Sequence, residues 1–249
     1  MRFLEFGNKQ NKKLLLIHGY NASWKMWNFY VKKLEVNYHI ILPILDGHDE
    51  KIKSNFISVE KCADNIIDYV KKECSGEIYS ICGASLGGTI AVDILLKNKL
   101  KIKKAVIDGA PLFPFKKFIV NIAIKQRLKM NKDARNGNKK LFKNIEKIYS
   151  KEAAEDMYNV SLQMSDITCK NANYSSCLYN LSEEIKKSNT EIFYWYGSKE
   201  AFLVKKSTNL IMKYGKNCKL KVFKGYVHGQ LVLGNQELFL SNFENFLNN

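Results

Sequence analysis

The sequence predicts an α/β protein with a mostly parallel, doubly wound sheet and an inserted helical cap. Short apolar runs alternate with segments whose apolar residues recur at helical spacing, as in parallel strands joined by crossover helices. One run leads into a glycine-rich bend at residues 83–87, and the alternation stops after the fifth run and resumes at the sixth. We therefore expect a core formed by residues 1–111 and 190–249 and a cap formed by residues 112–189.

The composition is that of a globular protein with a sizeable core. The chain has 249 residues, of which 46% are hydrophobic, enough for one domain with an insertion. Its charged beginning contains no apolar stretch typical of a secretion signal, and no run approaches the roughly 20 apolar residues that span a bilayer. The six cysteines include no C-x-x-C pair, so we expect reduced thiols and a cytoplasmic location.

The positive charge is concentrated in the expected cap. The chain has a net charge of +16, and the segment from Lys116 to Lys151 contains twelve basic and two acidic residues, a net of +10. A solvated surface is the ordinary explanation for such lysines. The alternative is a basic cap that attracts substrates with an anionic head and an apolar tail, or makes peripheral contact with anionic lipid. No nucleic-acid recognition motif accompanies the charge, and the oligomeric state stays open.

The first elements follow from apolar runs and turn residues. Residues 2–6 alternate weakly and residues 14–17 are continuously apolar, which predicts an edge hairpin leading inward. A polar loop, 18–23, follows at the carboxyl end of the second strand, where loops of parallel sheets open onto a cleft. Helical spacing of apolar residues then predicts a helix over 24–34, and the next strand covers 38–42.

The middle of the chain continues the alternation. Pro43 begins a turn that runs to Asp49, and a helix with an apolar face over 59–70 leads to the apolar strand that begins at Ile78. After the glycine-rich bend, a helix continues to Leu96. The strand 103–107 completes the first part of the core.

The cap and the last part of the core complete the prediction. The cap contains helical patterns such as 115–122 and 141–149, without a convincing strand. Strands are predicted at 192–196 and 220–223, with a helix between them, and a terminal helix carries the apolar residues of 238–247. These assignments give seven strands in total.

The bend Gly83-Ala84-Ser85-Leu86-Gly87 points to a nucleophile. A serine hydroxyl must be exposed at a tight strand-to-helix turn where a histidine can reach it, and small neighbours permit that turn. The apolar strand before the bend and the helix after it supply this context. A phosphate-binding loop is the other glycine-rich option, but no Lys-Ser or Lys-Thr follows Gly88. We therefore predict that Ser85 is catalytic.

Four separate motifs resemble the α/β-hydrolase family, and they occur in the family's order. They are an H-G loop at His18-Gly19, a slightly contracted D-x-G-H turn at Asp46-Gly47-His48, the bend around Ser85, and a late histidine loop at residues 225–229. The resemblance implies a serine hydrolase that cleaves an ester or thioester through an acyl-enzyme, with no cofactor. The family sheet has eight strands, one more than predicted here, and the family commonly inserts a lid where this chain has its cap.

The catalytic base must be one of four histidines. His39 lies within a predicted strand, while His18 and His48 occupy turns that look structural in this family. His228 lies in a glycine-flanked loop after the last strand and fits the order of nucleophile, acid and histidine. We therefore predict that His228 activates Ser85.

The acid that orients the histidine has two candidates. Glu200 ends the sequence Gly197-Ser198-Lys199-Glu200, where the family pattern normally has aspartate. Asp108 closes the preceding strand, a place from which some family members, such as certain haloalkane dehalogenases, take their acid. Either carboxylate can accept from Nδ1 of the histidine, so both stay open.

Other site residues are predicted from their positions next to these motifs. Leu86 and Tyr20 supply the backbone N–H groups of a candidate oxyanion hole. A substrate pocket or simple packing accounts equally for a set of aromatic residues, Tyr20, Trp24, Trp27, Phe113 and Phe115. The histidine and cysteine spacings predict no metal site.

Several functions remain compatible with the sequence. An esterase acting on a small acyl substrate leads. The family resemblance also allows a peptidase like the proline iminopeptidases or a hydrolase of carbon–carbon bonds. A binding protein that keeps the fold without catalysis is the alternative from another class, and a missing triad member would be its sign.

Overall fold

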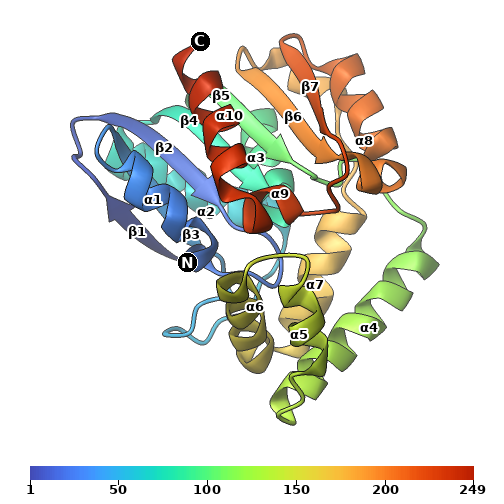
Figure 1. Cartoon of the computed structure of the whole chain (residues 1–249). Helices are drawn as coiled ribbons and strands as arrows, with labels where there is room; N and C mark the ends of the chain where they lie inside the picture. The colour runs from blue at the N-terminus through green and yellow to red at the C-terminus, as the bar shows by residue number, and fades with distance from the viewer.

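The computed structural model describes all 249 residues. It consists of one sheet with helices on both faces and further helices at one end (Figure 1). The seven strands have the order β1-β3-β2-β4-β5-β6-β7. Their bounds are β1 (Arg2–Phe6), β2 (Lys12–Ile17), β3 (Tyr38–Ile44), β4 (Glu77–Ala84), β5 (Lys101–Asp108), β6 (Glu191–Gly197) and β7 (Cys218–Phe223). The predicted number of strands and the mostly parallel α/β fold are confirmed.

The first two strands do not form the predicted hairpin. β1 pairs antiparallel with β3, with Leu4 opposite Leu42, and all other pairs in the sheet are parallel. β2 lies between β3 and β4, and Leu14 to Ile17 are fully buried. Because both edges of β2 are already hydrogen-bonded, β1 cannot pair with β2, and it joins the sheet at the outer edge of β3. The hairpin prediction was therefore wrong.

Two apolar layers hold the helices against the sheet. One face is covered by η1 (Trp24–Trp27), α1 (Asn28–Leu34), α9 (Gln230–Gly234) and α10 (Gln236–Asn248), and the other by α2 (Val59–Cys74), α3 (Leu86–Lys97) and α8 (Ala201–Tyr214). Figure 1 shows α1 and α10 in front of the sheet and α2 and α3 behind it. None of the helices combines the length and the hydropathy needed to cross a lipid bilayer.

Side-chain caps fix where several helices begin. Ser58, Ser150 and Ser165 each accept a hydrogen bond from the backbone N–H three residues later, at the starts of α2, α6 (Lys151–Gln163) and α7 (Asp166–Cys177). Such a cap satisfies an N–H that has no acceptor within the helix and contributes about 1 kcal/mol. At Ser58 this serine cap begins the helix that the sequence predicts over 59–70.

The chain between β5 and β6 contains helices joined by loops and no strand, and it covers the segment expected to form the cap. Its helices are α4 (Lys117–Arg135), α5 (Lys140–Glu146), α6 (Lys151–Gln163), α7 (Asp166–Cys177) and η2 (Glu183–Lys187). Helices α4 to α7 gather at one end of the sheet, and α4 is the outermost of them (Figure 1). α4 packs on α6 and α7. The cap therefore lies at the end of the sheet where β4 gives way to Ser85.

Candidate active site

Ser85 occupies a strained turn between β4 and α3. Its φ is 53° and its ψ is −115°, and its N–H donates to the Asp108 carbonyl over 2.7 Å. A Cβ on Gly83 would lie 2.2 Å from the Gly87 carbonyl oxygen, and a Cβ on Gly87 would lie 2.3 Å from the Ile17 carbonyl oxygen. Only glycine fits at either position, so strand and helix pass at contact distance and Ser85 is left at the apex.

Three of the predicted residues form one hydrogen-bonded chain. His228 Nε2 lies 2.9 Å from Ser85 Oγ, and His228 Nδ1 lies 2.5 Å from Glu200 Oε2. The second Glu200 oxygen accepts the Gly197 N–H over 2.8 Å, and only 3% of the Glu200 side chain is exposed. With Nδ1–H donating to Glu200, Nε2 is left to accept from the serine hydroxyl. The carboxylate therefore sets both the tautomer and the direction of the ring.

The charges around His228 favour its protonated form. Burial lowers the pKa of the imidazole, but the hydrogen bond and charge of Glu200, with the charge of Asp108, outweigh burial and raise it above its ordinary value. The side chain is still 42% exposed. The ring is thus held by its carboxylate partner while one side remains open to a substrate or a water molecule.

Asp108 lies close to the same pair but holds a different position. It is buried at the end of β5, and its carbonyl, rather than its carboxylate, binds the Ser85 N–H. Burial raises the pKa of the Asp108 carboxyl to about 7, the charge of Glu200 adds to the rise, and His228 opposes it. Of the two acids that the sequence left open, Glu200 is the one that contacts the imidazole.

The backbone N–H groups proposed for an oxyanion hole lie beside Ser85. Leu86 begins α3, and the first N–H groups of a helix have no acceptor within it. A Cβ on Gly19 would lie 3.6 Å from Ser85 Cβ, so the loop carrying Tyr20 passes next to the serine. The Tyr20 N–H donates to no backbone carbonyl. Both N–H groups thus lie close to Ser85 without a backbone acceptor, and their role as an oxyanion hole stays a prediction.

Helix α6 of the cap holds the Tyr20 loop in place. The Asp156 carboxylate accepts the Ser23 N–H over 2.7 Å and the Ser23 hydroxyl over 2.6 Å. Asn21, whose φ is 57°, accepts a hydrogen bond from the Ser161 hydroxyl over 2.9 Å. Sequence reasoning missed these contacts. The sequence feature that could have indicated them is Asp156, a charged residue on the buried face of α6, three positions after Ala153.

The cap also supports the histidine loop. The Tyr149 hydroxyl donates to the His228 carbonyl over 2.9 Å, and the next residue, Ser150, donates its N–H to the Leu233 carbonyl over 3.2 Å. The segment between α5 and α6 is therefore hydrogen-bonded to the loop that carries the catalytic ring.

The other histidines are structural. His18 is fully buried with Nδ1 3.0 Å from the Gly19 carbonyl, and burial, aided by the charge of His48, lowers the pKa of His18 to about 3. Burial also lowers the pKa of His48 to about 4. His39 binds Glu5 of β1 over 2.9 Å. None of these rings is in the hydrogen-bonded chain with Ser85.

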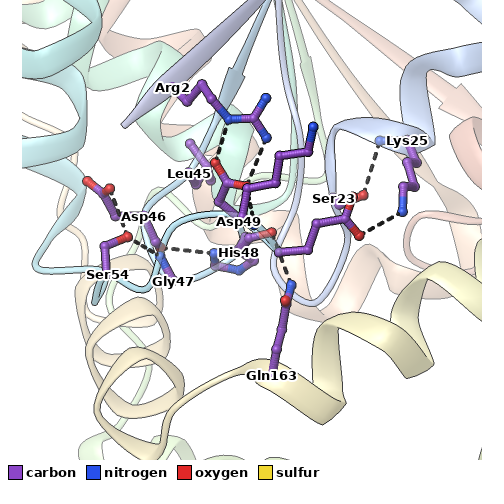
Figure 2. A network of polar contacts seen from close by, with 12 residues as sticks. Arg2, Ser23, Lys25, Leu45, Asp46, Gly47, His48, Asp49, Ser54 and Gln163 are labelled. Atoms are coloured by element: carbon purple, nitrogen blue, oxygen red, sulfur yellow. Dashed lines mark hydrogen bonds and ion pairs between the residues drawn. The ribbon is translucent and has the colours of Figure 1, made fainter.

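The turn at Asp46-Gly47-His48 is tied to its surroundings by polar side chains (Figure 2). The Ser54 hydroxyl donates to the Asp46 carboxylate and accepts the Gly47 N–H, each over 3.1 Å. Gln163, the last residue of α6, reaches the His48 carbonyl over 3.4 Å. The turn that resembles the family's D-x-G-H motif thus meets the cap without contributing to the chain of Ser85, His228 and Glu200.

Of the predicted pocket residues, Trp27 is a core residue and Trp24 is a partly buried residue packed against the core. Trp27 is 1% exposed and packs edge-on against Tyr30 and near Phe239 of α10, so it lines no pocket. Trp24 is near-parallel to Phe6 of β1, 6.5 Å between ring centroids, and packs on the same apolar layer. Helical spacing brings both rings onto the sheet face. Packing, the alternative left open by the sequence, therefore applies to Trp27, and a pocket role for the partly exposed Trp24 stays a prediction.

Two further residues of the predicted pocket set, Phe113 and Phe115, lie where the chain enters the cap. Phe113 has the Lys206 ammonium 4.6 Å from its ring centroid, and Phe115 donates its N–H to the Cys177 carbonyl of α7. Both side chains are partly exposed. Their role in a pocket stays a prediction.

A surface cavity of about 620 Å³ lies away from this site. It is lined by residues at the amino ends of the strands, including Lys12 of β2, Glu77 of β4 and Lys101 of β5. Ser85 follows the carboxyl end of β4, at the opposite edge of the sheet. No three histidine, cysteine or acidic side chains converge to hold a metal ion anywhere in the chain.

Comparison with known proteins identifies the family. A sequence model described as "alpha/beta hydrolase fold" matches residues 12–165. A pimeloyl-[acyl-carrier protein] methyl ester esterase of Vibrio vulnificus is 25% identical over 105 residues, covering 42% of this chain and 39% of the relative. The matched region thus spans 39–40% of the length of the curated relatives it resembles.

Solved structures agree over nearly the whole chain. A hydrolase of Pseudomonas aeruginosa superposes with a TM-score of 0.80 at 13% identity, covering 98% of this chain and 93% of the other. An esterase of Exiguobacterium antarcticum superposes with a TM-score of 0.78 at 17% identity, covering 99% of this chain and 95% of the other. At such identities the likeness concerns the fold. The order of the strands, the strained turn at Ser85 and the helical cap together define an α/β protein of the hydrolase type. The chain belongs to the alpha/beta hydrolase fold family.

Proposed function

We propose that the protein is a serine hydrolase that cleaves an ester or a thioester through an acyl-enzyme. The observation that carries the proposal is the chain of contacts from Glu200 to His228 to Ser85, with distances of 2.5 and 2.9 Å. A strained serine, a histidine whose second nitrogen faces it and a buried carboxylate behind the histidine are the parts that acyl transfer requires.

In the first half of the reaction, Ser85 Oγ attacks the carbonyl carbon of the substrate while His228 Nε2 takes the serine proton. Glu200 stabilises the imidazolium that forms, consistent with the raised pKa of His228. The imidazolium then protonates the leaving alcohol or thiol as its bond to the acyl carbon breaks. In the second half, His228 takes a proton from water, whose oxygen attacks the acyl-enzyme, and returns that proton to Ser85.

The negative oxygen of each tetrahedral intermediate is bound by the N–H groups of Leu86 and Tyr20. An N–H donor of this kind contributes about 10²–10³ in rate. Leu86 begins a helix of twelve residues, and the helix dipole adds a favourable field at that end.

Relatives support an ester substrate over the other reactions of the family. The Vibrio vulnificus relative is named a methyl ester esterase, and the Exiguobacterium antarcticum structure is that of an esterase. A protein that binds without catalysis is disfavoured because His228 contacts both Ser85 and Glu200, so no member of the triad is missing. All six cysteines are free, which supports the proposal that the enzyme works in a reducing compartment such as the cytoplasm.

A covalent probe tests the proposal directly. The wild-type protein should react with a fluorophosphonate and carry the adduct on Ser85, and it should hydrolyse short p-nitrophenyl esters. Ser85→Ala and His228→Ala should abolish turnover with an unchanged melting temperature, because both side chains lie at the surface of the site. Full activity in Ser85→Ala, or an adduct elsewhere in the wild type, would contradict the serine mechanism.

A further inference from the structure

One arginine near the site has no acidic partner. Only three of the 40 basic residues are arginines. Arg2 makes two hydrogen bonds of 2.9 Å to the Asp49 carboxylate, and Arg135 pairs with Asp166 over 3.1 Å. Arg127 forms no ion pair and no hydrogen bond with any side chain or backbone carbonyl. It is therefore the single guanidinium whose donors remain unused.

Arg127 lies over the loop that approaches the serine. It projects from α4 of the cap, is partly buried, and its guanidinium carbon is 4.7 Å from the centroid of the Tyr20 ring. The Tyr20 N–H is one of the proposed oxyanion donors, and the preceding Gly19 is next to Ser85. A guanidinium stacked on an aromatic ring uses its face, so its N–H edges stay available.

The charge of Arg127 reaches the reacting groups. Burial lowers the pKa of His228, Glu200 raises it, and the Arg127 charge adds to the lowering. Burial raises the pKa of the Cys177 thiol on α7, and Arg127 opposes this rise as well. The guanidinium is thus within electrostatic range of both the catalytic ring and the α7 side of the cap.

The same face of α4 carries a second unsatisfied group. Asn131 follows Arg127 by one helical turn, so the two side chains share a face. Asn131 is fully buried, and neither its Oδ1 nor its Nδ2 has a hydrogen-bond partner. A buried polar group without a partner is destabilising. Asn131 is therefore a second polar group without a partner on the face of α4 that carries Arg127.

We propose that Arg127 binds an oxyanion group carried by the substrate, so that the enzyme prefers esters or thioesters bearing a carboxylate or a phosphate over neutral ones. The planar guanidinium matches the two oxygens of such a group and forms two parallel hydrogen bonds to it. The proposal rests on the hydrolase function proposed above and adds to it the chemical class of the substrate.

The test compares two substrates of equal length. The 4-nitrophenyl monoester of glutaric acid carries a free carboxylate, and 4-nitrophenyl pentanoate has the same acyl chain without it. Arg127→Gln should lower kcat/KM for the carboxylate ester about 10- to 100-fold, the range expected for a charge-assisted hydrogen bond. The loss should appear mainly in KM, because the contact exists before and during the reaction. At a pH well above the pKa of His228, where the ring is neutral in both proteins, the neutral ester should change less than about twofold.

Two further variants and one further substrate sharpen the result. Arg127→Lys keeps the positive charge but loses the planar group that forms two parallel hydrogen bonds. It should retain part of the preference for the carboxylate ester. Lys125→Gln removes an exposed charge two positions earlier on α4 and should leave the preference intact. An ester whose leaving group carries a phosphate distinguishes the source of the oxyanion: a larger Arg127→Gln effect on it than on the carboxylate ester would assign the site to phosphate.

Other outcomes would overturn the inference. Equal losses for the charged and neutral esters in Arg127→Gln would mean that the arginine only supports Tyr20. No loss for any of the substrates would mean that Arg127 does not contact them. Ser85-dependent turnover of the neutral ester would uphold the hydrolase function in both cases, so failure of this inference is distinguishable from failure of that function.

Discussion

Gly109 lies directly against the ring of His228. A Cβ at position 109 would come within 3.0 Å of His228 Nδ1 and within 3.1 Å of Glu200 Oε2, and the φ of Gly109 is +59°. The ring of His228 and the carboxylate of Glu200 therefore pack directly against the backbone of Gly109, with no side chain between them. Space as well as charge determines where the imidazole can sit.

Gly109→Ala should displace the ring and lower kcat at least about 10-fold, because an error of about 1 Å in a catalytic group can cost about 10²-fold. Gly137→Ala is a matched control: its φ is +76°, but its added Cβ meets open space. Both variants should lose some melting temperature through backbone strain. Only the first should lose kcat, and an unchanged kcat in Gly109→Ala would contradict the crowding described here.

Replacing each acid should separate their roles. Glu200→Gln removes the carboxylate that receives Nδ1–H, and it should lower kcat by up to about 10⁴ by favouring the wrong tautomer. Asp108→Asn leaves the carbonyl that binds Ser85 in place and should lower kcat less than about 10-fold. Steady-state kinetics with a short p-nitrophenyl ester would measure both. A larger loss in Asp108→Asn than in Glu200→Gln would reverse the assignment.

The pH dependence follows from the raised pKa of His228. The ring must be neutral to accept the serine proton, so kcat/KM should fall as the pH drops through this pKa, above 6.5. Asp108→Asn removes a nearby negative charge that raises the pKa of His228, so the acidic limb should move to lower pH. A pH–rate profile from pH 5 to 9 would measure the shift. A limb that moves to higher pH would show that Asp108 does not act on the ring through its charge.

The contact between Asp156 and Ser23 should affect catalysis from outside the triad. Asp156→Ala removes the acceptor of two hydrogen bonds and frees the loop that positions the Tyr20 N–H. We expect kcat to fall by up to about 10², the loss typical of a missing oxyanion donor, with a smaller change in KM. Glu155→Ala, an exposed neighbour on α6, is the control. If kcat stayed normal while the melting temperature fell, Asp156 would be purely structural.

The basic surface of the cap gives a salt-dependent prediction. Lys139, Lys140 and Lys143 are all exposed. If their charges steer anionic substrates, kcat/KM for the carboxylate ester should fall steeply with added salt and the neutral ester should respond little, because screening acts over about 8 Å at physiological ionic strength. Replacing all three by glutamine should flatten the response. Identical salt profiles for the two esters would leave the lysines as a solvated surface.

The sequence predicted the parts of the fold that have a local signal. Each of the seven strands is a short apolar run, and the turn at Ser85 needs glycines at fixed spacing, so both could be identified from neighbouring residues. The partner of β1 could not, because which sheet edge is free depends on strands distant in the sequence. Trp27 was misassigned because apolar spacing along a helix does not tell a core contact from a pocket wall.

Local patterns in the sequence could not predict which acid contacts the histidine or which residues of the core the cap contacts. Asp108 ends β5 and Glu200 follows the end of β6 by three residues, and only the folded chain shows that the ring meets Glu200. The pair formed by Asp156 and Ser23 joins residues 133 positions apart. No spacing rule connects such distant residues, and the burial of Asp156 depends on how α6 packs.

The hydrogen bonds from the cap also limit how this protein can be rebuilt. The cap holds the loop that carries Tyr20 through hydrogen bonds made by Ser161 and Asp156. It holds the loop that carries His228 through a hydrogen bond from Tyr149. An insertion taken whole from another hydrolase would therefore remove supports of the reaction along with the walls of the binding site. Exchange of α4 alone, the outermost helix and the one that carries Arg127, would leave those supports in place and is the more promising route to a new substrate preference.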